Sequence, residues 1–238
     1  MTTIKILLQG FPGHTSRGWL GWSTVVLIRH GDHTILFDTG AYNDRPALIE
    51  ALGRENLSPA LIDTIILSHL HFDHVANVEL FSSAQIIVHQ AGLRYAQQQA
   101  ERDLALSSWL TTALLASPKL TIIEAEPELW PGLQIIQTPG HTSGCISVVL
   151  TINHETWLLA ADAVKTRAEL QIGQAEVGFD LIASQESISR IRKLADWVVP
   201  GHDVPLRVIG ETVEPDGTAL FDVTATLPGD EAVARLEL

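Results

Sequence analysis

Short apolar runs separated by polar turns dominate the first part of the chain. The runs at 4–9, 24–28 and 34–37 have the length and the β-branched content of strands. A glycine-rich segment, 10–22, separates the first two runs and is too long for a tight turn. The pattern therefore predicts a β-meander that carries one long, functional or flexible loop.

Helical patterns alternate with the next strands. Residues 46–54 have helical character, and Ser58 followed by Pro59 marks a short segment before an apolar strand at 64–67. After a strand at 84–89, a stretch rich in Ala, Leu and Gln ends at Pro118. We expect this helical insert, near 91–117, to form one or two helices that could cover an active site.

The second half repeats this theme. It predicts a helix at 184–195 and strands at 120–123, 133–136, 146–152, 156–160 and 197–199. An acidic, turn-rich C-terminal segment near 205–238 predicts a hairpin with a frayed end. Two strand-rich halves, each followed by helices, predict two sheets packed between helical layers, and we expect one domain over 1–238.

Composition narrows the class of protein. Of the 238 residues, 46% are hydrophobic and 18% are charged, which is typical of a globular chain and not of a disordered one. A net charge of −13 disfavours nucleic acid as a partner without excluding it. The same negative charge provides no electrostatic attraction to an anionic membrane. Cys145 is the only cysteine, and we expect it to be buried. With no signal-peptide pattern and no membrane-spanning run, we expect a cytoplasmic protein.

The highest density of side chains able to bind a metal lies directly after the strand predicted at 64–67. His69, His71, Asp73 and His74 follow it within a few residues. Residues two apart share no helix face, whereas an extended segment projects the first three to one side, with His74 entering from the next turn. Imidazoles and a carboxylate suit zinc, iron or a similar ion. The stretch predicts a strand end that presents metal ligands.

Three more candidate ligands follow other predicted strands. His141 comes after Thr-Pro-Gly, Asp162 after an apolar run, and His202 after Val-Val-Pro-Gly. Strand ends are rigid platforms with exposed tips, so several of them can bring ligands to one point. The joint pattern therefore predicts one shared metal site.

These motifs, with Phe-Asp-Thr-Gly at 37–40, resemble those of the metallo-β-lactamase fold superfamily and occur in the same order. The resemblance implies an α/β fold, a four-layer αββα sandwich of two mixed β-sheets flanked by helices. Leu-Leu-Gln-Gly at 7–10 and Ala-Asp-Trp-Val-Val-Pro-Gly-His at 195–202 are most similar to the branch that contains metallo-β-lactamase domain-containing protein one.

The resemblance also implies a ligand set for two divalent ions, with zinc expected first and iron or manganese as alternatives. The first ion would be held by His69, His71 and His141, the second by Asp73, His74 and His202, with Asp162 bridging. A hydroxide between the ions would be the nucleophile. Asp73 would act as a catalytic group that orients it or shuttles a proton, and Asp38 would accept a hydrogen bond from a ligand imidazole.

The favoured activity is hydrolysis of a small ester, lactone, thioester or amide. A phosphodiesterase or nuclease with the same site stays open, as does a mononuclear-iron sulfur dioxygenase, which shares the His-x-His-x-Asp-His signature. We expect a small-molecule substrate, and a homodimer stays open. Candidates for the substrate groove are His14, Arg17, Trp19, Trp22 and Lys165.

Overall fold

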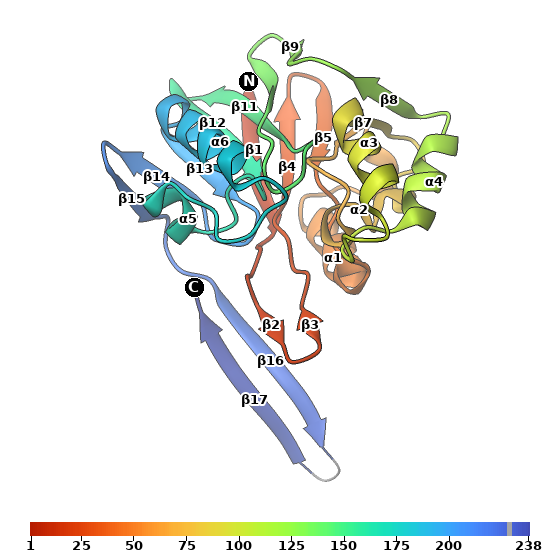
Figure 1. Cartoon of the computed structure of the whole chain (residues 1–238). Helices are drawn as coiled ribbons and strands as arrows, with labels where there is room; N and C mark the ends of the chain where they lie inside the picture. The colour runs from red at the N-terminus through yellow and green to blue at the C-terminus, as the bar shows by residue number, and fades with distance from the viewer. Residues whose placement is uncertain (228–229) are drawn as a thin grey trace.

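Two β-sheets lie face to face at the centre of the fold (Figure 1). The computed structural model describes residues 1–227 and 230–238. The first sheet has the strand order β1-β4-β5-β6-β7-β8, with antiparallel pairs up to β5 and parallel pairs beyond it. Its strands are β1 (Thr2–Leu8), β4 (Val25–His30), β5 (His33–Phe37), β6 (Thr64–Ile66), β7 (Gln85–His89) and β8 (Leu120–Ile123).

The second sheet has the order β15-β14-β13-β12-β11-β10-β9, and β12 and β13 are its one parallel pair among the described strands. Both sheets are therefore mixed. The strands are β9 (Glu128–Trp130), β10 (Leu133–Gln137), β11 (Ile146–Ile152), β12 (Glu155–Ala161), β13 (Trp197–Pro200), β14 (Leu206–Ile209) and β15 (Thr212–Pro215).

Helices cover the outer face of each sheet (Figure 1). The first sheet carries α1 (Arg45–Arg54), α3 (Gln90–Gln99) and α4 (Ser108–Ala116), and the second carries α5 (Arg167–Ile172) and α6 (Leu181–Leu194). A short α2 (Phe72–Val75) and three 3-10 turns, η1 (Tyr42–Asp44), η2 (Pro59–Leu61) and η3 (Val78–Leu80), are the other helical segments among the described residues. The predicted αββα sandwich is confirmed.

The alternation of apolar side chains along the strands builds this layering. On β4, Val26 and Ile28 pack between the two sheets, whereas Leu27 packs toward the helices of the first layer. On β12, Leu159 faces the inter-sheet core and Leu158 faces α6. Burying one such side chain contributes about 1.5–3 kcal/mol, so the three apolar clusters hold the strand ends in fixed relative positions.

The structure differs from the sequence prediction in two respects, which are the sheet that contains the strand at 120–123 and the backbone of the candidate ligand stretch. Residues 120–123 belong to the first sheet, because α3 and α4 form a crossover that brings β8 parallel to β7. The candidate ligand stretch is not extended throughout, since β6 ends at Ile66 and the backbone turns into α2 at Phe72. Asp73 and His74 therefore project from a helical turn, while His69 and His71 project from the loop before it.

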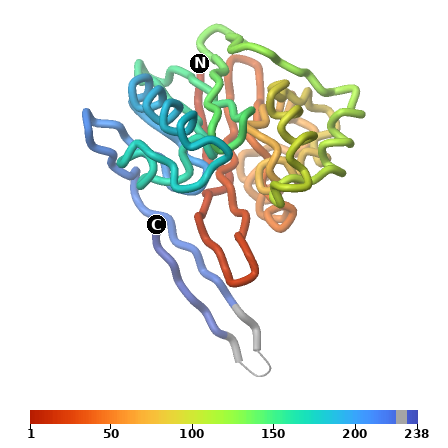
Figure 2. The backbone as a smooth tube through the Cα atoms, viewed as in Figure 1, coloured from red at the N-terminus to blue at the C-terminus, as the bar shows by residue number. Residues whose placement is uncertain are grey.

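Two hairpins project from the end of the sandwich (Figures 1 and 2). One is β2 (His14–Thr15) with β3 (Gly18–Trp19), within the long first loop, and the other is β16 (Leu220–Leu227) with β17 (Asp230–Glu237). Phe221, at the base of the longer hairpin, packs on Phe11 with ring centroids 4.7 Å apart. No helix in the described part of the chain has both the length and the apolar character that a membrane crossing requires.

Candidate metal centre

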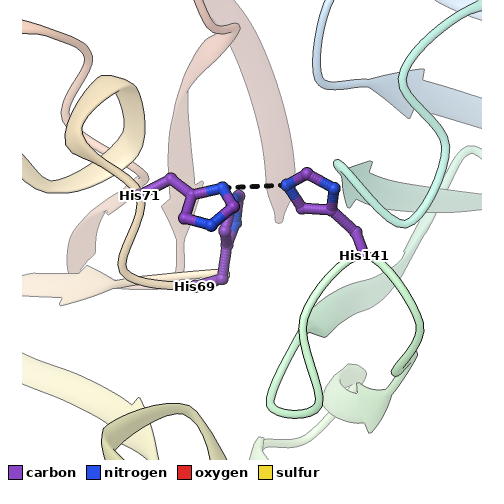
Figure 3. A group of neighbouring side chains, drawn as sticks. All are labelled: His69, His71 and His141. Carbon is purple, nitrogen blue, oxygen red and sulfur yellow. Dashed lines mark hydrogen bonds between the residues drawn. The ribbon is translucent and has the colours of Figure 1, made fainter. Parts of the chain in front are cut away.

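All seven candidate ligands meet where strands of both sheets end. His69 and His71 follow β6, and α2 carries the next two, Asp73 and His74. The second sheet supplies the remaining three from the loops that follow β10, β12 and β13, which are His141, Asp162 and His202. Figure 3 shows His69 and His71 on one loop facing His141 on another. The site therefore spans the two sheets.

Three imidazoles form the first group. His69, His71 and His141 each offer a ligand atom, and these atoms lie within 4.8 Å of one another. His71 Nδ1 is 2.9 Å from His141 Nε2, the contact drawn in Figure 3. The arrangement has the composition and spacing of a three-histidine metal site.

The second group is built from one carboxylate and two imidazoles. Asp73, His74 and His202 also have ligand atoms within 4.8 Å of one another. Asp162 lies between the two groups. Its Oδ1 is 3.2 Å from both His74 Nε2 and His202 Nε2, and its Oδ2 is 3.2 Å from His141 Nε2. One carboxylate thus faces both groups with different oxygens.

The ring nitrogens that face away from the site are held by neighbouring groups. His74 Nδ1 lies 2.7 Å from Asp38 Oδ2, and His202 Nδ1 lies 2.9 Å from the carbonyl of Trp22. The Ser68 hydroxyl lies 2.9 Å from His69 Nδ1 and donates to Asp38 Oδ2 at 2.7 Å. Such contacts fix ring orientation and tautomer. Asp38 therefore touches one candidate ligand directly and a second one through Ser68.

The backbone of Asp38 is in the left-handed region, with φ of 61°. An aspartate tolerates this conformation only at a cost, which the surrounding hydrogen bonds must offset. The Asp38 carboxylate accepts from the Ser68 backbone N–H at 2.8 Å, in addition to the two contacts above. The strained residue is thereby fixed directly behind the candidate ligands.

Unpartnered polar atoms inside the site fit metal ions. Within the described chain, His69 Nε2, His74 Nε2 and Asp162 Oδ1 are buried and make no hydrogen bond of good geometry. Leaving such atoms unpaired costs free energy. All belong to the groups above, and their nitrogen and carboxylate donors suit zinc or a similar divalent ion.

Burial and the neighbouring carboxylates shift the pKa values of the candidate ligands in opposite directions. Burial lowers the pKa of His69 well below its usual value, and burial lowers that of His141 to about 3. Burial acts in the same direction on His74, but the carboxylates of Asp162, Asp73 and Asp38 raise its pKa well above the usual value. Burial opposes ionisation of Asp162, yet the histidines beside it hold its pKa well below normal. Metal binding would displace the proton on His74.

Two residues near the site, Asp103 and Tyr95, do not belong to any of the sequence motifs described above. Asp103, in the loop between α3 and α4, has its Oδ2 2.8 Å from His71 Nε2 and 2.7 Å from the hydroxyl of Tyr95. Burial tends to raise the pKa of Asp103, but the contacts with His71 and Tyr95 lower it below the usual value. The one indication of Asp103 in the sequence was that it is an acidic residue within an insert predicted to cover the site.

A cavity of about 720 Å³ opens onto the candidate ligands. Its lining includes His71, Asp73, His141, Asp162 and His202. Large apolar side chains that are exposed to solvent also line it, and they come from several parts of the chain: Trp19, Leu104, Ile172, Val177 and Phe179. The cavity thus combines a polar metal-site floor with apolar walls.

The residues proposed for the substrate groove divide into two groups. Trp19 and Lys165 line the cavity, and Lys165 Nζ lies 3.0 Å from Glu169 Oε1. His14, Arg17 and Trp22 are not among the described residues that line it. The first two lie on the exposed β2–β3 hairpin, and the Trp22 ring packs on Phe11 and Phe221.

The fold and the ligand motifs define a class of protein. The family model of the metallo-β-lactamase superfamily matches residues 19–202, so the chain belongs to this superfamily of metallohydrolases, as the motifs predicted. Metallo-β-lactamase domain-containing protein 1 of the mouse is 32% identical over 221 residues, which are 90% of this chain and 77% of the mouse protein.

Lactonases are further relatives. An N-acyl homoserine lactonase of a Bacillus species is 32% identical over 162 residues, which are 66% of this chain and 62% of the lactonase. Among solved structures, the dizinc quorum-quenching lactonase AidC matches with a TM-score of 0.68 and 20% identity, over 82% of this chain and 79% of AidC. At that identity the match shows the shared fold.

Proposed function

We propose that this chain is a metal-dependent hydrolase with two metal ions, acting on a small ester, lactone, thioester or amide. The observation that carries the proposal is the placement of Asp162, whose two carboxylate oxygens lie 3.2 Å from nitrogens of the two ligand groups. A carboxylate between two sets of ligands is what a bridged pair of ions requires.

The residues have distinct roles in this proposal. His69, His71 and His141 would hold the first ion, Asp73, His74 and His202 would hold the second, and the Asp162 carboxylate faces both groups. Bound zinc ions would supply Lewis acidity toward the carbonyl oxygen of the substrate and a lowered pKa for water. The carboxylate of Asp73 lines the cavity, with Oδ2 3.7 Å from His202 Nε2, so it can hold or move a proton there.

The cavity supports a small molecule with an apolar portion as the substrate. Its volume of about 720 Å³ lies within the range of small-molecule sites, about 300–1,000 Å³. The apolar walls would bury a hydrocarbon part of the substrate while its carbonyl group reaches the ligands. The net charge of −13 supports a small molecule over a nucleic acid backbone. The sequence similarity to N-acyl homoserine lactonases supports lactones as the first substrates to test.

The test measures hydrolysis of matched substrate panels by the zinc-loaded protein. The panels are acyl homoserine lactones, aryl esters, thioesters and bis-p-nitrophenyl phosphate. We expect turnover of lactones or esters, with loss of activity in His71→Ala and Asp162→Ala. His33→Ala, a substitution on β5 outside the ligand groups, is the matched control and should retain activity.

Other outcomes identify the competing activities. Turnover of the phosphodiester alone would favour the nuclease alternative. Iron in place of zinc in protein purified without added metal, together with oxygen consumption, would favour the sulfur dioxygenase. Full turnover in Asp162→Ala would contradict the two-ion proposal.

A further inference from the structure

The loop between α3 and α4 closes directly against the first ligand group. The backbone N–H of Phe72 donates to the carbonyl of Ala105 at 2.9 Å, and His71 forms a β-bridge with Leu106. Ala105 N–H in turn donates to Asp103 Oδ1 at 3.1 Å. Backbone contacts of the two residues Ala105 and Leu106, which closely follow Asp103, therefore tie the loop to the ligand segment.

Asp103 makes two side-chain contacts through a single oxygen. Its Oδ2 lies 2.8 Å from His71 Nε2 and 2.7 Å from the Tyr95 hydroxyl. Tyr95 is itself buried, and its ring packs edge-on against Phe179 at 5.0 Å between centroids. The tyrosine hydroxyl thus holds the same carboxylate oxygen that lies beside His71.

The chemistry of these groups fixes the tautomer of His71. An ionised carboxylate only accepts hydrogen bonds, so His71 Nε2 must carry the hydrogen that lies toward Asp103. The lone pair of the neutral ring is then at Nδ1, the atom 2.9 Å from His141 Nε2. The nitrogen that faces the other ligands is the one left free to bind a metal.

We propose that Asp103, held by Tyr95, is the positioning residue of the first metal ion. The inference rests on the proposed function, because it concerns the ions of that site. The proposal predicts that loss of Asp103 weakens the binding of one ion and not of the other. Asp38 contacts His74 directly and His69 through Ser68. Among the candidate ligands in the described chain, Asp103 contacts His71 alone.

The experiment measures zinc affinity by competition with a chromophoric chelator, in the wild type and in variants. In Asp103→Ala we expect one of two zinc ions to bind about 10–100-fold more weakly and the other to keep its affinity. Tyr95→Phe removes only the hydroxyl group and should weaken the same ion by a smaller factor. Turnover should fall in the same order.

Glu176→Gln is the matched control, because Glu176 also lines the cavity but is not among the ligand groups. It removes a negative charge and should leave both affinities unchanged. Thermal unfolding of each variant reports whether the fold is intact. If Asp103→Ala does not fold, Tyr95→Phe alone decides the question.

The two proposals fail in different ways. A wild type that binds two zinc ions, with Asp103→Ala or Tyr95→Phe binding both as tightly, would overturn the role of Asp103 and leave the hydrolase proposal standing. Equal weakening of both ions would also overturn it. A wild type that binds fewer than two ions would overturn the two-ion hydrolase, and the inference would fall with it.

Discussion

At the scale of single residues, the space around Asp162 depends on a glycine. Gly201 precedes His202, and its N–H donates to the carbonyl of Ala161 at 2.9 Å. A Cβ at Gly201 would overlap Asp162 Oδ1. We expect Gly201→Ala to displace the carboxylate and to lower turnover about 100-fold, since misplacement of a catalytic group by about 1 Å can have that effect. Zinc content and kcat measure the result.

The control for this substitution is a glycine with free space. Gly53 lies in α1, and nothing would lie within 4 Å of an added Cβ. Gly53→Ala should therefore raise the free energy of unfolding by about 0.5–1 kcal/mol without changing turnover. Full activity and full zinc content in Gly201→Ala would contradict the position of Asp162.

At the scale of secondary-structure elements, the start of α6 supports the loop that carries His141. The Asp180 carboxylate accepts from the N–H groups of Ile182 and Ala183, both at 3.0 Å, and Asp180 N–H donates to the carbonyl of Gly140 at 2.9 Å. We expect Asp180→Ala to reduce the free energy of unfolding by about 1 kcal/mol in urea titrations. Asp180→Asn, which still caps a helix, should lose much less, so equal losses would contradict the capping role.

A second contact of α6 predicts a pH dependence. Arg190 binds both oxygens of Glu126, with Nη1–Oε1 at 2.6 Å and Nη2–Oε2 at 2.8 Å. The hydrogen bonds from Arg190 lower the pKa of Glu126 below its usual value of 4.5. A lowered carboxyl pKa stabilises the fold above the unfolded-state pKa, and this contribution disappears as the pH falls through the folded-state pKa.

The measurement compares wild type with Arg190→Gln. Because both side chains are partly exposed, we expect the wild type to exceed the variant by about 0.2–1 kcal/mol in free energy of unfolding near neutral pH. The difference should narrow as the pH falls below 4.5. A difference that is constant down to pH 3 would show that the pair contributes through packing and not through charge.

These elements also show how far the sequence could predict the structure. The alternation of apolar residues predicted the layers, because each strand face must be buried against something. Sequence periodicity does not specify a strand's neighbour, so 120–123 was placed in the wrong sheet. Likewise, His71 and Asp103 are separated by 32 positions, and their contact exists only after α3 and α4 fold back.

The candidate ligands could be predicted from the sequence because each one lies in a short local motif after a strand. His89 has no such motif, and the structure buries it, with Nδ1 accepting from Ala91 N–H at the start of α3. Cys145 is buried as expected. Its Sγ lies 3.1 Å from the Thr142 hydroxyl, and the apolar strand β11 begins at the next residue.

At the scale of the whole molecule, the candidate ligands connect the two sheets. His69 and His71 belong to the first sheet's side, whereas His141, Asp162 and His202 belong to the second. Without ions, the facing atoms include buried nitrogens and an oxygen that make no good hydrogen bond in the described chain. Bound ions would satisfy these atoms and hold the sheets together, so metal binding should be coupled to stability.

Removal of metal tests this coupling. We expect a strong chelator to lower the melting temperature of the protein and added zinc to restore it, because ligands that bind only the folded state stabilise it by about 2.7 kcal/mol at a concentration 100-fold above Kd. Asp162→Ala removes the carboxylate that faces both groups. Its melting temperature should therefore respond much less to zinc. If wild type and Asp162→Ala respond equally, zinc stabilises the chain somewhere other than between the sheets, and the coupling argued from the ligand positions is wrong.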